Sequence, residues 1–120
     1  MPDASPTLSV SQLKDISVIE FTNNKILDEA NIEEIKTTLF GLIDAKAQPK
    51  LLLDFGNVDH MSSAALGTLI NVRNRVIEKN GQLRLANIKP QIFEVFVITK
   101  LNKLFRILPN RQEAAASFST

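Results

Sequence analysis

The hydrophobic and polar positions along the chain predict five strands. Alternation with a period of two over residues 8–14 indicates a weak strand at a sheet edge, and the Ile- and Val-rich run at 16–21 indicates a firmer one. The run Leu51–Phe55 is almost continuously apolar, which is typical of a strand covered on both faces. Two further short strands are predicted at 82–86 and at 103–108.

Apolar residues at three- and four-residue spacing predict four helices, the first of which ends near residues 45–48, ahead of Pro49. Its buried stripe is expected to comprise Ile32, Ile35, Leu39, Leu42 and Ile43. At its start, Asn31 followed by Glu34 fits a capping box, and Asp28 is an alternative cap.

The second helix is predicted over 62–79, because Leu66 and Leu69 begin an apolar stripe and Asn80-Gly81 supplies a stop. The last helix is predicted over 111–118.

The third helix begins at Pro90, since proline is tolerated in the first turn, and Phe93 is expected on its inner side with Ile92 and Phe96. This helix is apolar nearly all round. It is either deeply covered or presents Val95 or Val97 to a partner or to a second copy, and we favour burial.

The resulting order, β-β-α-β-α-β-α-β-α, predicts an α/β fold. Strand–helix–strand units dominate from Leu51 onward, so most strands should be parallel, joined by right-handed crossovers, with the opening pair forming an antiparallel or mixed edge. We therefore expect a mixed, mostly parallel sheet of four to five strands with about four helices. Residues 1–7 are expected to form a flexible tail, and residues 8–120 a single domain.

Composition narrows the functional classes. The 14 Lys and Arg residues against 13 Asp and Glu residues are interspersed, and Trp and Tyr are absent, so nucleic-acid binding is not expected. Cysteine is absent, no apolar run reaches the ~20 residues of a membrane span, and the start of the chain is polar. We expect a cytoplasmic protein without a direct membrane span.

Cofactor and metal sites are not expected either. The four glycines form no phosphate-binding loop, and the single His60 and the scattered carboxylates lack metal-ligand spacing. Asp54 and Asp59 flank a turn and are interpreted as solvated turn residues.

Two serines at the start of the second helix are the candidate functional residues. Ser62 or Ser63 can cap the helix, act as a nucleophile or accept a phosphate. A hydrolase is disfavoured because the glycines of a nucleophile elbow are missing and His60 is the only histidine. Serine is among the best helix caps, and Ser62 fits that role.

Gly67 is unusual because glycine inside a helix costs up to ~1 kcal/mol relative to alanine. Either the helix packs closely against a neighbour at this point, or a low surface is kept for another protein. That surface would comprise Ala64, Gly67, Thr68 and Asn71.

The segment Ser62-Ser63-Ala64-Ala65-Leu66-Gly67, after its strand and turn, resembles the signature of STAS domains, specifically of bacterial anti-sigma factor antagonists. That signature reads Asp-Ser-Ser/Thr-Gly-Leu-Gly, and the resemblance in element order runs from about Leu8 to Phe118. Aligned on Leu66-Gly67, the family's phosphorylated serine falls on Ser63. Its preceding aspartate falls on Ser62, and its glycine falls on Ala65.

The resemblance implies a protein without catalytic activity of its own. It implies binding to an anti-sigma factor that is also a serine kinase, release by phosphorylation of Ser63 (with Ser62 as the alternative), and resetting by a phosphatase. The family's other functional aspartate falls on Asp28. ATP and magnesium would belong to the kinase. The departures at 62 and 65 keep open a STAS adaptor that is not phosphorylated, in a stressosome-like scaffold or beside a transporter, and a small serine hydrolase is the remaining alternative.

Overall fold

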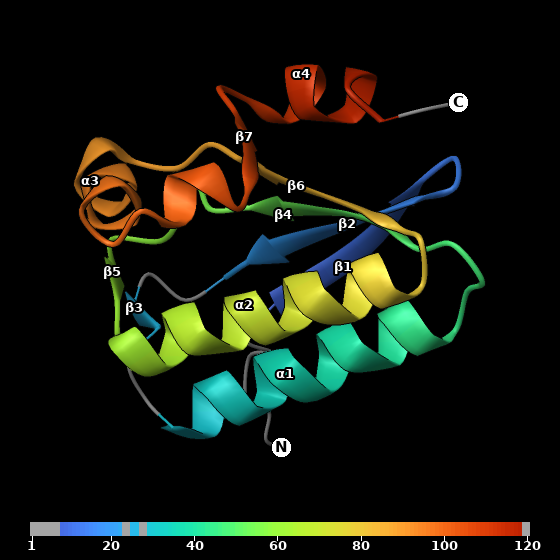
Figure 1. Ribbon diagram of the computed structural model, residues 1–120, viewed down its shortest axis with the longest axis horizontal. Helices are drawn as coiled ribbons and strands as arrows, with labels where there is room; N and C mark the ends of the chain where they lie inside the picture. Colours follow the sequence, from blue (N-terminus) through green and yellow to red (C-terminus); the bar gives the residue numbers. More distant parts are fainter. Residues whose placement is uncertain (1–7, 23–24, 27–28, 119–120) are drawn as a thin grey trace.

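A five-stranded sheet forms the centre of the computed structural model, which describes residues 8–22, 25–26 and 29–118. Its strands lie in the order β1, β2, β4, β6, β7 (Figure 1). The first pair is antiparallel and all other neighbours are parallel, which confirms the predicted mixed sheet. The strands are β1 (Leu8–Leu13), β2 (Ile16–Phe21), β4 (Lys50–Asp54), β6 (Gln82–Ala86) and β7 (Arg106–Leu108).

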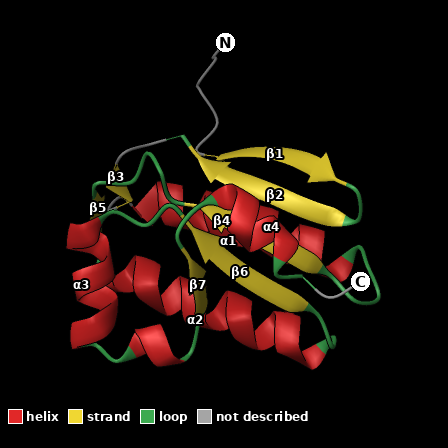
Figure 2. Cartoon of the chain, turned by 90° about the horizontal axis from the view of Figure 1, so that it is seen from above, coloured by secondary structure: helices red, strands yellow, loops and turns green. Residues whose placement is uncertain are grey.

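Helices cover both faces of the sheet. The long helices α1 (Glu29–Asp44) and α2 (Ser63–Glu78) lie side by side on one face, and the short α4 (Arg111–Ala116) lies on the other (Figures 1 and 2). The helix α3 (Pro90–Ile98) and the 3-10 helix η1 (Leu101–Lys103) stand at one end of the molecule. Four α-helices are thus present among the described residues, as predicted.

The central strand β4 divides the core into two parts. Leu51 and Leu53 point into the main cluster under α1 and α2, whereas Leu52 packs on the opposite face with Ala114 and Phe118. The apolar run of this strand is therefore buried on both faces, as its sequence predicted. On α1, the predicted stripe also faces the core, with Leu42 only partly buried.

The start of α1 differs from the capping-box prediction. The helix begins at Glu29, so Asn31 lies inside the first turn and does not cap it. Both Asn and Asp are favoured at the residue before a helix, so residue preference alone does not decide which of two candidates three positions apart caps it. The alternative cap, Asp28, lies outside the described residues.

The end of α2 uses both residues of the predicted stop. Asn80 adopts the left-handed conformation with φ of 57°, which ends the helix. Gly81 donates its N–H to the Val76 carbonyl at 2.8 Å and is needed for a different reason. A Cβ at this position would lie 2.3 Å from the carbonyl oxygen of Pro49, the residue before β4, so glycine is needed where α2 turns into β6.

Two predictions about irregular segments are corrected, and two short strands are present that the sequence pattern did not predict. The strand predicted at 103–108 is limited to Arg106–Leu108, because Lys100 turns into the left-handed region with φ of 64° and η1 follows it. Two short strands, β3 (Lys25–Ile26) and β5 (His60–Met61), pair in parallel as a separate ladder. Helix α3 is not deeply covered: Ile92 and Phe96 are buried, but Phe93 is 41% exposed.

Asp54 and Asp59 are not solvated turn residues. Asp54 is 4% exposed, and its Oδ1 accepts hydrogen bonds from Gly56 N at 2.9 Å and from Asn87 Nδ2 at 3.1 Å. Its Oδ2 accepts from Arg111 Nε at 2.9 Å, so the carboxylate joins the end of β4 to α4. Asp59 is half-buried and forms an ion pair with Lys89.

Candidate functional site

The start of α2 lies where the parallel strands end. The chain leaves β4 at Asp54, passes through β5 and enters α2 at Ser63. Asn57 fixes this connection, because its Nδ2 donates to the Phe21 carbonyl oxygen at 3.2 Å at the end of β2. The carboxyl ends of parallel strands are the common place for binding sites in open α/β sheets.

Ser62 is the helix cap. Its backbone is extended (φ −89°, ψ 165°), and its Oγ accepts a hydrogen bond from Ala65 N at 3.1 Å. The Leu66 N–H donates to the Ser62 carbonyl oxygen at 3.2 Å and begins the helical ladder. The capping interpretation of Ser62 is confirmed, and its hydroxyl is already engaged in the fold.

Ser63 is the first residue of α2 and is exposed to solvent. At this position the backbone N–H groups of the first turn have no partner within the helix, and the helix dipole favours negative charge. The first turn carries no acidic side chain that would oppose an added phosphate. Ser63 therefore presents a hydroxyl where a phosphate is electrostatically favoured.

Small side chains surround Ser63 on the outer side of α2. Ala64 and Asn71 are exposed, and Gly67 is half-buried. A Cβ at Gly67 would meet no atom within 4 Å, so packing inside this chain does not require glycine there. We call Ser63, Ala64, Gly67 and Asn71 the α2 face.

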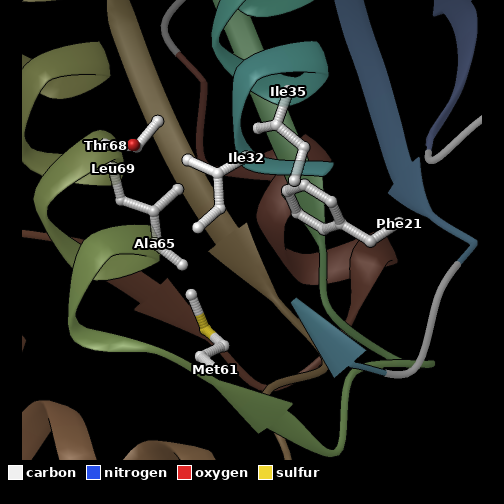
Figure 3. A pocket seen from close by; sticks show the side chains of 7 residues that line it. All are labelled: Phe21, Ile32, Ile35, Met61, Ala65, Thr68 and Leu69. Carbon is white, nitrogen blue, oxygen red and sulfur yellow. The ribbon is translucent and has the colours of Figure 1, made fainter. Parts of the chain in front are cut away.

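Thr68, which was expected on the same surface, points inward. It is 9% exposed and lines a narrow space between α1 and α2 together with Ala65 and Leu69 (Figure 3). The other side chains that line this space are Phe21, Ile32, Ile35 and Met61. The space measures about 10 Å³, close to the minimum for one water molecule, so it is a packing gap beneath the α2 face and not a ligand pocket.

The other predicted site residues are not part of the α2 face. Asp28 lies outside the described residues. His60 is exposed on β5. Within the described ranges, no three His, Cys, Asp or Glu side chains gather as metal ligands would, and no helix there is long and apolar enough to cross a bilayer.

Sequence reasoning missed two charged contacts near this edge of the sheet. One joins Asp54 to Arg111, which are 57 positions apart, and the other joins Asp59 to Lys89. The predicted parallel crossovers bring the ends of β4 and β6 to one edge of the sheet, which is a signal for the Asp59–Lys89 contact, whereas nothing local marks Arg111 as a partner of Asp54. The first contact ties the end of β4 to α4, and the second ties the loop before β5 to the start of α3.

Comparison with known proteins identifies the class to which this fold and site belong. The STAS domain model matches residues 7–114, and the chain belongs to the STAS domain family. A protein named as an anti-sigma factor antagonist, BtrV of Bordetella bronchiseptica, is 33% identical over 95 residues, which is 79% of this chain and 81% of that protein.

Solved structures agree on the fold. An anti-sigma-factor antagonist (STAS) domain protein from Planctomyces limnophilus has a TM-score of 0.81 at 22% identity, covering 92% of this chain and 96% of that one. The Bacillus cell fate determinant SpoIIAA, solved in its phosphorylated form, has a TM-score of 0.71 at 18% identity, covering 91% and 96%. Both likenesses confirm the predicted architecture.

Proposed function

We propose that this chain is an anti-sigma factor antagonist whose α2 face captures an anti-sigma factor with serine-kinase activity. Phosphorylation of Ser63 by that kinase releases the partner, and a separate phosphatase restores binding. Support comes from the name of the Bordetella relative and from the SpoIIAA structure in a phosphorylated form. The observation that carries the proposal is an exposed Ser63 hydroxyl at the start of α2, beside an open glycine.

The structure favours Ser63 over Ser62 as the acceptor. The Ser62 Oγ is held by Ala65 N and the residue is half-buried, so a kinase would have to break the cap to reach it. Losing a serine cap costs about 0.5–2 kcal/mol. Ser63 is exposed and a phosphate there leaves the cap in place.

A phosphate on Ser63 affects the fold and the complex in opposite directions. It adds about −1.5 to −2 charges, and near a helix N-terminus such charge stabilises by about 0.3–1 kcal/mol. A partner seated on the α2 face must instead bury that charge, which costs several kcal/mol without a matching cation. Because about 2.8 kcal/mol corresponds to a hundredfold change in Kd, one phosphate is sufficient for release.

The remaining predicted contacts are assigned by exposure. Ser63, Ala64, Gly67 and Asn71 would touch the partner, while Ser62 and Thr68 would support that surface from within. Asp28, which precedes α1 in the sequence, is proposed to add a further contact. ATP and magnesium would be bound by the kinase, and the complex would form in the cytoplasm.

The test uses a purified candidate anti-sigma factor with serine-kinase activity, with binding measured by isothermal titration calorimetry. Ser63→Asp is expected to abolish capture, and Ser63→Ala is expected to bind but resist phosphorylation in intact-mass analysis. Ser9→Asp, at an exposed serine on β1, is the matched control and should bind normally. Equal binding of the wild type and Ser63→Asp would overturn the switch. Binding without any phosphorylation would instead indicate a STAS adaptor.

A further inference from the structure

An apolar surface lies on α3 and just after η1, outside the α2 face. Phe93, Val97 and Ile98 on α3 and Leu104 just after η1 are all exposed, and Ile98 is 74% exposed. We call these four residues the α3 patch. Single exposed apolar residues are ordinary on a protein surface, but four within 12 positions form a group that calls for an explanation.

The patch is held in place by contacts beneath it. The ring of buried Phe105 packs edge-on against Phe96, with centroids 5.7 Å apart. Arg73 of α2 donates its Nε hydrogen to the Leu104 carbonyl oxygen at 2.8 Å. The exposed side chains therefore stand on an ordered backbone, and a surface ordered in advance loses less conformational entropy on binding.

The border of the patch is basic. Lys100 and Lys103 are exposed between Ile98 and Leu104 along the chain, and Glu94 is the only acidic residue between positions 89 and 106. Over the whole chain, in contrast, 14 basic residues face 13 acidic ones. Complementary charges between two surfaces speed association and disfavour other partners. A ligand that matches this surface therefore carries carboxylates, which face the basic residues, together with apolar side chains.

A groove lies between α3 and the segment that leads into α2. It has a volume of about 310 Å³ and lies between Asp59, His60 and Met61 on one side and α3 on the other. The α3 side chains that line it are Gln91, Ile92 and Val95. Val95 lines the groove, and Ile98, three residues further on, lies on the same side of α3. Met61 directly precedes Ser62, so this side of α3 lies next to the segment that enters α2.

We propose that the α3 patch is a second docking surface for the captured partner protein and receives a segment that combines acidic and apolar side chains. This inference rests on the proposed function, because it assigns a further contact to the same partner. Ile98 and Leu104 supply the apolar contact, and Lys100 and Lys103 pair with the partner's carboxylates.

The surface chemistry favours a protein over an anionic lipid bilayer. Glu94 lies three and four residues before Val97 and Ile98, so its carboxylate shares their side of the helix. That carboxylate would be repelled by anionic headgroups and is costly to move toward the hydrocarbon. A protein can offer a donor to Glu94 and to the polar side chains of the groove.

The first test measures Kd for the same kinase by calorimetry. Ile98→Glu is expected to weaken binding at least tenfold, and the double change Lys100→Glu/Lys103→Glu at least fivefold. Ile77→Glu is the matched control, because Ile77 is 51% exposed on α2 outside the patch, and it should change Kd less than twofold. Wild-type affinity in both patch variants would overturn the inference while leaving the Ser63 switch intact.

The second test needs no kinase, so it separates this inference from the proposed function. The ¹⁵N-labelled chain is titrated with a helical peptide of leucine and glutamate, and with the same peptide carrying lysine for glutamate. Shifts at amides between 93 and 104 with the acidic peptide alone support the patch, and their absence overturns it. Sedimentation with phosphatidylglycerol vesicles that Ile98→Glu abolishes would assign the patch to membranes and overturn it as well.

Discussion

The substitution Gly67→Ala should make the protein more stable and weaken capture of its partner. Gly67 lies inside α2, where glycine costs up to ~1 kcal/mol relative to alanine, and the added Cβ would meet no atom within 4 Å. The methyl group therefore gives alanine's more favourable helix propensity without a steric clash. A gain of ~1 kcal/mol corresponds to a rise in Tm of roughly 3–6 °C for a domain of this size.

Binding should change in the opposite direction. In the complex the same methyl group occupies the centre of the α2 face, and overpacking a fitted contact costs about 1–3 kcal/mol. Since about 1.4 kcal/mol is a factor of ten in Kd, capture should weaken roughly five- to hundredfold. The measurement is calorimetric titration with the kinase beside a thermal melt of each variant.

Gly41→Ala provides the matched control. Gly41 is exposed within α1, and a Cβ there also meets no atom within 4 Å. It should raise Tm comparably and leave Kd unchanged. Wild-type affinity in Gly67→Ala would refute the assignment of the α2 face, and a lowered Tm would show that Gly67 serves the fold.

Three further predictions concern the fold. Ser62→Ala should lower the free energy of unfolding by about 0.5–2 kcal/mol in urea titrations, because it removes the cap on Ala65 N, whereas Ser63→Ala should change it little. Gly81→Ala should destabilise by about 1–3 kcal/mol, seen as a lower urea midpoint, since its Cβ would clash with Pro49. The Arg75 guanidinium lowers the pKa of Asp44 below its ordinary 3.8, so this pair stabilises the fold above that pH and ceases to do so as pH falls through the lowered pKa. Unfolding free energies at pH 5 and pH 3 should therefore differ less in Arg75→Gln than in the wild type; an equal difference would contradict this assignment.

The regular elements of this fold were predictable because each carries a local signal. In β4, α1 and α2 the apolar residues are those that face the core. The pattern of apolar positions in the sequence therefore predicted which side chains are buried. Ser62 was predictable as a cap because its hydrogen bond spans only three residues. Gly67 stood out by its cost in a helix, although only the structure shows the open space above it.

Features that depend on distant partners were not predictable in this way. Asp54 is a polar residue at the end of an apolar strand, as the first residue of a turn would be, and its carboxylate is paired with Arg111, far along the chain. The two-residue strands β3 and β5 are too short for any periodicity to mark them. For α3, composition predicted a buried helix, but only its Ile92 and Phe96 side reaches the core.

Phosphorylating Ser63 itself is the most direct test of the central claim. The chain is converted to the singly phosphorylated form by the proposed partner kinase, and the position is verified by peptide mass spectrometry. Kd and Tm are measured before and after removal of the phosphate. We predict a Kd at least a hundredfold weaker with Tm preserved, and recovery of binding after dephosphorylation. Undiminished affinity of the phosphorylated chain, or a loss of binding that comes from unfolding, would contradict a surface charge switch at the start of α2.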